Sequence, residues 1–357
     1  MKNGKIGIGI IGAGNIAQSA HLPAYAKLQD CEIVSIFDHK PGRAAQCAAK
    51  FTPGEVPQVA GSLEDLLNNP AVDAVSVCTW NNGHAASSIA ALKAGKHVLC
   101  EKPMAMTVAE AQAMKAAADA SGKVFLTGFV SRFRSDVKII REMAEEGKFG
   151  TFYYARASSL RRRGTPLGWF TDPKKAGGGP VIDIGVHVLD MTWYLLGKPE
   201  PIAVSATVHK HIGDYQTKGV SRWEAFDTDD LVFGVEDSAA GMIRFANGCS
   251  LNFDVSWALN GEPTEAHAAW LYGDKAGCSL LPFKVFGEDA GYLTDNVPVL
   301  DKGGRDFDNV FVREMRHFLD CIHGKCQPLS PAADGLAVQK MLNGIYDSAA
   351  AGKEILL

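Results

Sequence analysis

The segment Ile6–Ala17, IGIGIIGAGNIA, decides the fold of the first part of the chain. Its first half is short, apolar and rich in isoleucine, which is typical of a strand buried on both faces. It then breaks into Gly-x-Gly-x-x-Ala at Gly12, Gly14 and Ala17. In such a turn the first glycine permits a tight bend and the second lets a pyrophosphate approach the backbone. The small third residue keeps the following helix close to the sheet.

The residues after this turn complete a dinucleotide-binding βαβ pattern. We predict a helix from Asn15 to about Leu28, kinked or interrupted at Pro23, and a second apolar strand over Glu32–Phe37. That strand ends in Asp38, whose carboxylate would accept hydrogen bonds from an adenosine ribose and repel a 2′-phosphate. The sequence therefore predicts NAD as cofactor, while Lys40 and Arg43 would soften the preference over NADP. The expected cofactor contacts here are Gly12, Ala13, Gly14, Asn15, Ile16 and Asp38.

The composition is that of an ordinary globular protein. Hydrophobic residues make up 46% of the 357 residues and charged residues 21%, and this length suits two domains with separate cores. A net charge of -4 gives no reason to expect a nucleic acid or an anionic membrane as partner. No apolar run is long enough for a membrane span, and no export-signal pattern is present. The eight scattered cysteines contain no Cys-x-x-Cys pair, so we expect reduced thiols and a cytoplasmic protein.

The pattern of expected strands and helices changes near residue 125, which predicts two domains. Up to that point, short apolar strands alternate with helices, which indicates parallel βαβ units in a doubly wound sheet. The expected helices include Gly42–Lys50, Ser62–Leu67, His84–Lys93 and Val108–Ser121, and the expected strands include Ala74–Cys78, His97–Cys100 and Val124–Thr127. We therefore predict an α/β protein with a Rossmann domain over residues 1–125 and a second domain over 126–357.

The second part reads mainly as an antiparallel sheet. Helices are expected at Ser135–Glu146, Asp183–Leu196, Val310–Ile322 and Ala333–Ala351, and strands at Thr151–Ser159, Ile202–Lys210, Thr228–Val235, Ala239–Phe245 and Cys249–Trp257. Successive strands joined by short turns favour antiparallel pairing, and Asn247-Gly248 is typical of a hairpin.

Two polar segments follow strands of the first domain, where ligands bind in open α/β sheets. Cys100-Glu101-Lys102-Pro103 places a lysine between an acid and a stiffening proline, and we predict that Lys102 lies beside the nicotinamide, with Glu101 next to it. The segment Thr79-Trp80-Asn81-Asn82-Gly83-His84 follows a neighbouring strand. We expect Thr79, Trp80, Asn81 and His84 to line the cofactor cleft, although helix capping by Asn82 or a neighbour would also explain polar residues there.

A third feature lies in the second domain. Gly177–Gly179 lead into a helix on which Asp183 and His187 are four residues apart and share one face. A carboxylate one turn away can tune and orient a histidine as a proton acceptor, so we predict an acid/base pair. Metal binding by Asp183, His187 and Asp190 is the alternative, but we expect no metal because no second ligand cluster is visible nearby.

These blocks together resemble the Gfo/Idh/MocA oxidoreductases, relatives of glucose–fructose oxidoreductase and inositol dehydrogenase. The resemblance covers nearly the whole chain. It rests on Gly12–Ala17, on Ala94–Pro103, on the triglycine with Asp183-x-Gly185-x-His187, and on Pro328–Ser330 with Asp334-Gly335. It implies a Rossmann domain followed by an α/β domain whose large, mostly antiparallel sheet forms dimers or tetramers.

The resemblance also implies roles for individual residues. Lys102 would contact cofactor and substrate, Asp183 would hold a substrate hydroxyl, and His187 would act as acid and base. The chain departs from the family at Trp80, where a proline is usual. It also carries a basic segment, Arg161–Trp169, that is no general family motif. Within that segment we predict substrate contacts at Arg163 and Trp169, an arginine and an aromatic platform that would suit a sugar.

The sequence thus predicts an NAD-dependent oxidoreductase acting on a secondary alcohol or ketone of a sugar, cyclitol or related polyol. Three alternatives stay open at this point: an NADP(H)-dependent keto-sugar reductase, redox-assisted glycoside cleavage, and a non-catalytic NAD-binding sensor on the same fold. Because Lys102 and His187 are both present, the sensor is the weaker alternative.

Overall fold

The computed structural model describes residues 4–50, 56–220, 232–264, 267–300 and 305–357. The chain forms two compact units: unit 1 comprises Met1–Val130 and Asp306–Gln339, and unit 2 comprises Ser131–Arg305 and Lys340–Leu357. Among the described residues, no helix is long and apolar enough to cross a membrane.

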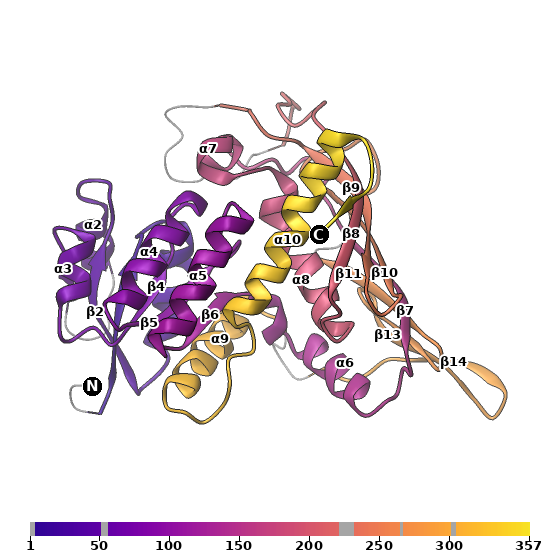
Figure 1. Cartoon of the computed structure of the whole chain (residues 1–357), viewed down its shortest axis with the longest axis horizontal. Helices are drawn as coiled ribbons and strands as arrows, with labels where there is room; N and C mark the ends of the chain where they lie inside the picture. Colours follow the sequence, from indigo (N-terminus) through magenta and orange to yellow (C-terminus); the bar gives the residue numbers. More distant parts are fainter. Residues whose placement is uncertain (1–3, 51–55, 221–231, 265–266, 301–304) are drawn as a thin grey trace. The chain divides into compact units, whose positions relative to one another are not determined.

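Unit 1 is built on a six-stranded parallel sheet of strand order β3-β2-β1-β4-β5-β6. Its strands are β1 (Ile6–Ile11), β2 (Cys31–Phe37), β3 (Gln58–Val59), β4 (Ala74–Val77), β5 (His97–Glu101) and β6 (Phe125–Gly128). The helical segments are η1 (Ala17–His21), α1 (Leu22–Ala26), α2 (Arg43–Lys50), α3 (Leu63–Asn68), α4 (Asn81–Lys93), α5 (Val108–Ser121) and α9 (Phe307–Ile322). Helices α4 and α5 lie side by side along the sheet (Figure 1). The predicted doubly wound sheet is confirmed.

Strand β1 is buried along its whole length, as its apolar run predicts. Its isoleucines Ile6, Ile8 and Ile10 belong to one apolar core cluster. Two of the three alternate positions, 7 and 9, are glycines, and a Cβ at Gly9 would lie 2.9 Å from Leu66 of α3. Small residues on that side therefore let the α3 side of the sheet pack closely against β1.

The first helical segment is interrupted, as Pro23 predicts. A π-helical turn, η1, precedes the α-helical turn α1, and Pro23 lies in the first turn of α1. A proline cannot donate an intrahelical hydrogen bond, and irregular bonding next to it is the usual result. Ala17 is fully buried in the core beside the sheet, which is the close packing that its small side chain permits.

Residues 306–339 return to unit 1. Helix α9 packs against η1 and α1, and α10 (Ala332–Ala351) begins beside β6 and ends in unit 2. Ser330 and Thr127 exchange backbone and side-chain hydrogen bonds of 2.8 and 2.6 Å. A Cβ at Gly335 would collide with Met104 and lie 2.7 Å from Thr127 Oγ1, so only glycine allows this approach.

Unit 2 is built on a nine-stranded sheet of order β14-β13-β12-β11-β7-β10-β9-β8-β15. Its strands are β7 (Phe152–Leu160), β8 (Pro201–His209), β9 (Ser238–Phe245), β10 (Ser250–Ser256), β11 (Ala268–Gly273), β12 (Gly277–Leu280), β13 (Phe283–Asp289), β14 (Tyr292–Asn296) and β15 (Ile355–Leu356). The pairing is antiparallel except between β7 and β10, which are parallel. The predicted large, mostly antiparallel sheet is therefore confirmed.

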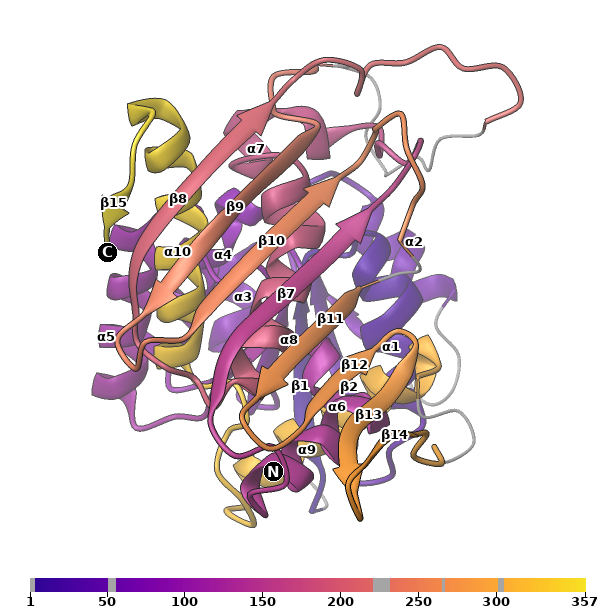
Figure 2. The same ribbon diagram turned by 90° about the vertical axis from the view of Figure 1, so that its right-hand side faces the viewer.

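One face of this sheet packs against helices of the same unit. The helical segments are α6 (Ser135–Glu145), η3 (Trp169–Thr171), α7 (Pro173–Ala176), η4 (Val181–Gly185) and α8 (Val186–Leu195). Helix α8 packs on β7 and β11, and η4 packs on β10. Figure 2 shows the opposite face, with β8, β9, β10, β7 and β11 side by side.

Some predicted elements of unit 2 differ from the structure. The hairpin at Asn247-Gly248 is confirmed, because Gly248 has a φ of +85° and joins the antiparallel strands β9 and β10. The predicted strand Thr228–Val235 lies half outside the described residues, and its described half, 232–235, is not a strand. The sequence analysis named no strand at β3, β11, β12, β13, β14 or β15. Of these, β3 and β15 are only two residues long, and β14 is mostly exposed.

Candidate active site

The turn after β1 is shaped for close backbone contact. Gly12 has a φ of +93°, and a Cβ there would lie 2.6 Å from the Cys78 carbonyl oxygen at the end of β4. At Gly14, by contrast, a Cβ would meet no described atom within 4 Å, so the tip of the turn is open. A crowded first glycine and an open second one are what a pyrophosphate-binding turn requires. The turn therefore fits the nucleotide cofactor that the sequence predicts.

Asp38 follows β2 and holds this turn in place. Its Oδ2 accepts a hydrogen bond of 2.8 Å from the Ala13 N–H, and its Oδ1 accepts one of 2.8 Å from the Lys40 N–H. The carboxylate side chain is only 3% exposed, and the Arg43 guanidinium lies 3.9 Å away. Because each carboxylate oxygen has two lone pairs, these bonds leave room to accept from a ribose hydroxyl. Asp38 thus orders the loop that its predicted role requires.

The segment after β4 is tied to the segment after β5 by His84. The buried imidazole lies with Nδ1 2.7 Å from the Pro103 carbonyl and Nε2 3.2 Å from the Thr79 carbonyl. Burial lowers the pKa of His84, so the ring is neutral and donates to one of the two carbonyls, Pro103 being the closer. We conclude that His84 positions two loops at the carboxyl edge of the sheet. Cofactor contact remains a prediction for Thr79 and Trp80, both half-buried, and for Asn81 and His84, both buried.

Helix α4 begins earlier than predicted. It starts at Asn81 rather than His84, and its N-cap residue is Trp80, whose side chain does not cap the helix. The proposed capping by Asn82 is therefore wrong: the first turn already forms when the Gly83 N–H bonds the Trp80 carbonyl at 2.8 Å.

Lys102 stands directly after β5, beside a buried acid. Glu101 is 5% exposed, and its Oε1 lies 2.8 Å from His21 Nε2 while its Oε2 accepts from the Lys102 N–H at 3.1 Å. Burial raises the pKa of Glu101, but His21 and the Lys102 ammonium outweigh burial, and the net pKa is lowered. An ionised Glu101 thus fixes the backbone from which the half-buried Lys102 projects. The sequence analysis missed His21, whose only sequence signal is a histidine directly before the apolar segment Leu22–Ala26.

A second buried acid, Glu314 on α9, lies close enough to Glu101 to feel its charge. Glu314 is fully buried, and neither of its carboxyl oxygens has a hydrogen-bond partner among the described residues. Burial, and next the charge of Glu101, raise the pKa of Glu314 well above its ordinary value. Two carboxyls in one apolar site do not both ionise readily, so Glu101 is charged and Glu314 is protonated near neutral pH.

This pair leads to a prediction about stability. A carboxyl whose pKa is raised by folding contributes stability below its unfolded pKa and loses it as the pH rises through its folded value. We expect Glu314→Gln, which keeps the shape without the titration, to raise the unfolding midpoint relative to the wild type at pH 8 and to change it little at pH 4. Each unit of raised pKa corresponds to about 1.4 kcal/mol. Thermal unfolding across this pH range is the measurement, with the exposed Glu64→Gln as control. An equal loss of stability at every pH would show that the carboxyl makes a bond the fold needs.

In unit 2, Asp183 lies in the π-helical turn η4, directly before α8. Its Oδ2 accepts a hydrogen bond of 3.0 Å from Nε1 of Trp257, which is fully buried. The half-buried carboxylate is thus held against an indole ring, with lone pairs that can accept from a further hydroxyl. Single π-turns within helices occur often at functional sites, where they re-aim side chains.

His187 lies one turn further, in the first turn of α8, and is half-buried. Its ring stacks on that of His267 at a centroid distance of 5.0 Å, and Ser159 Oγ lies 3.1 Å from His267 Nδ1. Trp257 and His267, which the sequence analysis missed, follow β10 and precede β11, neighbours of β7 on either side. The sheet therefore brings a polar and aromatic group around Asp183 and His187.

The triglycine before η4 serves an internal contact. Glu236 accepts hydrogen bonds from the Gly179 N–H at 2.9 and 3.0 Å, from the Val181 N–H at 3.2 Å and from Tyr346 Oη at 2.8 Å. A Cβ at Gly178 would collide with the Tyr346 hydroxyl, and one at Gly179 with the Glu236 carbonyl. Burial raises the pKa of Glu236 although these bonds oppose it. The glycines thus admit a buried acid that anchors the start of the Asp183 helix.

Asp190, the third member of the alternative metal set, is engaged by an arginine. Arg132 Nη2 lies 2.6 Å from Asp190 Oδ1, and both side chains are at most 1% exposed. The guanidinium balances the charge of this buried carboxylate, and breaking such a buried pair is costly. Among the described residues, the group of side chains close enough together to hold a metal ion is a different one: His317, Cys321 and Cys326.

The two residues of the basic segment lie in different surroundings. The Arg163 guanidinium donates to the carbonyls of Arg162 and Leu259, to Asn260 Oδ1 and to Thr217 Oγ1 at 2.6 to 3.1 Å. These bonds take most of its five donors, so Arg163 holds loops of unit 2 together. Trp169 is half-buried and stacks on Phe170 at 4.1 Å. Substrate contact at either residue remains a prediction.

Comparison with known proteins places the chain in a family. Residues 6–129 match the family model GFO_IDH_MocA, described as "Oxidoreductase family, NAD-binding Rossmann fold", and residues 137–279 match the GFO/IDH/MocA C-terminal domain. The chain is 35% identical to D-glucoside 3-dehydrogenase of Escherichia coli K12, over 100% of this chain and 99% of that protein.

Solved structures agree with this placement. An oxidoreductase domain protein from Kribbella flavida is 26% identical with a TM-score of 0.85, and the match covers 99% of both chains. A levoglucosan dehydrogenase in complex with NADH and L-sorbose is 25% identical with a TM-score of 0.83, over 99% of this chain and 98% of that one. As the sequence motifs predict, the chain belongs to the GFO/IDH/MocA family of oxidoreductases and is an NAD(P)-dependent dehydrogenase acting on CH–OH groups.

Proposed function

We propose that the protein oxidises a secondary alcohol of a sugar, cyclitol or related polyol with NAD. The observation that carries this proposal is the arrangement at η4 and α8. There the Asp183 carboxylate is held by the Trp257 indole, and the His187 ring is stacked on His267. A fixed carboxylate, an imidazole and aromatic walls are the groups that hold and deprotonate a polyhydroxylated ring. The 35% sequence identity to a glucoside dehydrogenase over the whole chain supports the same substrate class.

In this proposal each residue has one task. His187 takes the proton of the reacting hydroxyl, and Asp183 accepts a hydrogen bond from a substrate hydroxyl. Lys102 donates to the reacting oxygen and stabilises the negative charge that develops there. Bound at the turn of Gly12 to Ile16, the nicotinamide cofactor supplies the hydride acceptor. The reverse reaction, reduction of a keto sugar, uses the same residues.

The cofactor preference for NAD rests on Asp38. Its carboxylate, ordered by the Ala13 and Lys40 N–H groups, would repel a 2′-phosphate. The basic neighbours act in the opposite sense, since the Arg43 guanidinium lies 3.9 Å from Asp38 and the Lys40 ammonium lies over the Trp80 ring. Removing the negative charge should therefore leave a site that tolerates the phosphate.

We expect Asp38→Ser to narrow the preference for NAD over NADP by about tenfold or more, the effect of about 1.4 kcal/mol. The KM for NAD should also rise, because the Ala13 and Lys40 N–H groups lose their acceptor. Steady-state kcat/KM with both cofactors is the measurement. A wild-type kcat/KM with NADP equal to or above that with NAD would overturn the assignment.

We further propose that unit 1 binds the cofactor and that unit 2 binds the substrate and forms a homodimer or homotetramer through its sheet. The sheet face opposite α8 carries a hollow of about 460 Å³. Arg156, which lines this hollow, lies over the Trp270 ring at 5.2 Å, and on the same two strands, β7 and β11, Tyr154 stacks on Tyr272 at 5.2 Å. Aromatic and arginine side chains of this kind are enriched at protein interfaces.

Light scattering should therefore give a mass of two or four times that of the single chain. Arg156→Glu should shift it toward the monomer, because it reverses a charge on that face. A monomeric wild type would contradict the proposed assembly.

We also place the enzyme in the cytoplasm, a proposal supported by eight unpaired cysteines, seven of them buried.

A screen of monosaccharides, inositols and anhydrosugars with NAD and NADP tests the proposed function. Formation of reduced nicotinamide with at least one of these polyols, followed at its absorbance band, is the expected result. Calorimetric binding of NAD with no turnover of any polyol or keto sugar would instead identify a non-catalytic sensor. Release of an aglycone without net cofactor reduction would identify redox-assisted glycoside cleavage.

A further inference from the structure

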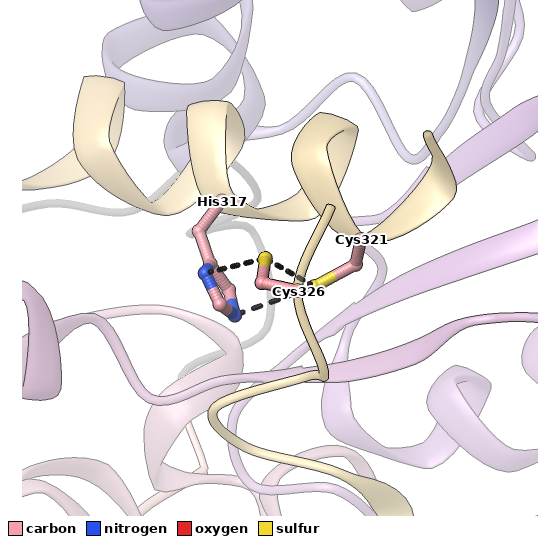
Figure 3. A group of neighbouring side chains, drawn as sticks. All are labelled: His317, Cys321 and Cys326. Carbon is pink, nitrogen blue, oxygen red and sulfur yellow. Dashed lines mark hydrogen bonds between the residues drawn. The ribbon is translucent and has the colours of Figure 1, made fainter. Parts of the chain in front are cut away.

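A cluster of one histidine and two cysteines lies at the end of α9 in unit 1. His317 and Cys321 are four residues apart on the same face of the helix, and Cys326 comes from the loop that follows it (Figure 3). The two sulfur atoms are 3.5 Å apart. Cys321 Sγ lies 3.4 Å from His317 Nε2, and Cys326 Sγ lies 3.6 Å from Nδ1. None of these residues takes part in the proposed oxidoreductase chemistry.

The tertiary structure holds the two thiols together. Cys321 is fixed on α9, and the loop after Cys326 is anchored four residues later, where Ser330 bonds Thr127 of β6. In the loop between Cys326 and Ser330, the Leu329 N–H donates to His317 Nε2 at 2.9 Å. The sulfur atoms are therefore in contact without any rearrangement of the chain.

The bond from Leu329 also decides where the imidazole carries its proton. Burial lowers the pKa of His317, so the ring is neutral. Because Nε2 accepts from Leu329, the single ring proton lies on Nδ1, which faces Cys326 Sγ. An N–H that donates to sulfur favours the thiolate over the thiol. His317 thus presents a hydrogen-bond donor to the Cys326 sulfur.

The two thiols differ in their access to solvent. Cys326 is partly exposed, whereas Cys321 is only 5% exposed, and burial raises the pKa of Cys321 to about 12. A small oxidant therefore meets Cys326 first, while Cys321 remains a protonated thiol in contact with it. This is the arrangement of an oxidation-sensitive cysteine with a resolving partner.

We propose that Cys326 and Cys321 form a reversible disulfide when the protein meets a peroxide. The Cys326 thiolate attacks a peroxide oxygen and the O–O bond breaks. With hydrogen peroxide, one proton is taken up, water leaves and Cys326 becomes a sulfenic acid. Cys321 Sγ then attacks Cys326 Sγ, the S–O bond breaks, and the departing hydroxide takes the Cys321 proton to form water. In sum, two thiols lose two electrons and two protons, and one peroxide becomes two waters.

The same hydrogen bonds argue against a metal ion at this cluster. A metal bound through Nε2 would displace the Leu329 N–H, and one bound through Nδ1 would displace the ring's only proton while Leu329 still occupies Nε2. The part of the chain that the structure describes also offers zinc three ligands at this cluster, whereas structural zinc sites have four.

Trypsin makes the disulfide easy to detect, because Lys325 separates the two cysteines. Cleavage after Arg316, Lys325 and Lys340 places Cys321 in peptide 317–325 and Cys326 in peptide 326–340. After brief treatment of the whole protein with hydrogen peroxide and blocking of remaining thiols, a non-reducing digest should contain these peptides linked. Dithiothreitol should separate them again. Peroxide that converts Cys326 to sulfinic acid without the linked pair would overturn the proposal.

Variants separate the roles of the three residues. Cys326→Ser and Cys321→Ser should each abolish the linked pair, while Cys249→Ser, a buried cysteine in unit 2, should leave it unchanged. His317→Phe should slow formation of the linked pair roughly tenfold, because it removes the ring nitrogen that faces Cys326 Sγ. The circular-dichroism spectrum and the unfolding midpoint of His317→Phe should match those of the wild type, which separates a lost imidazole from a damaged fold. Equimolar Zn²⁺ bound by the reduced protein, and lost in either serine variant, would mark the cluster as a metal site and overturn the disulfide.

Discussion

His187→Ala should lower kcat for polyol oxidation by roughly two to four orders of magnitude, the usual range for a lost general acid/base. In the proposed mechanism the imidazole takes the hydroxyl proton as hydride leaves the carbon that bears this hydroxyl. Without it, the proton must pass to water, which is a weaker base. The affinity for NAD should change little, because the cofactor turn lies in unit 1 and His187 in unit 2.

The pH profile distinguishes catalysis from a structural role for His187. Neutral imidazole accepts the proton, so wild-type kcat for oxidation should rise from acidic to neutral pH, and this dependence should disappear in His187→Ala. His209→Ala, an exposed histidine of the same unit, is the matched control and should keep the native profile. Near-native kcat of His187→Ala at every pH would make His187 structural, and the mechanism would fail.

Lys102→Ala should lower kcat by about two to three orders of magnitude, the usual cost of losing one donor to a developing oxyanion. The ammonium interacts more strongly with the substrate oxygen as negative charge grows, so the loss falls mainly on the transition state. The rise in KM for the polyol should be smaller than the fall in kcat. Steady-state kinetics with the polyol, together with NAD binding by calorimetry, separate the two effects.

Two further variants test the geometry at Lys102. Lys102→Arg should not rescue activity fully, because a planar guanidinium cannot take the place of a compact ammonium. Lys115→Ala, which removes a lysine on α5 of the same unit that pairs with Asp119, should behave as the wild type. If Lys102→Ala keeps its kcat and loses only affinity for NAD, this lysine holds the cofactor and does not stabilise the oxyanion.

Local patterns in the sequence determined the framework of unit 1. The helix Val108–Ser121 is confirmed to the residue, because Thr107 and Glu110 form a capping box at its start and Gly122, with a φ of +63°, ends it. Ser62 caps α3 as predicted, accepting from the Asp65 N–H. The turn at Gly12 and the carboxylate at Asp38 also follow from their spacing alone. Caps, turns and strand runs are readable in this way because neighbours within a few residues specify them.

The partners of the candidate site residues depended on the tertiary structure. Trp257 bonds Asp183 from 74 residues away, and Glu236 holds Gly179 from 57 residues away. Glu314 meets the charge of Glu101 only because α9 returns to unit 1 after the whole of unit 2. Such contacts are set by strand order and by the path of the chain, so the hydrophobic periodicity of a single segment does not predict them. The sequence thus marked Asp183, His187 and Lys102 by residue type and spacing, whereas the groups that hold and tune them come from distant strands and helices that only packing brings together.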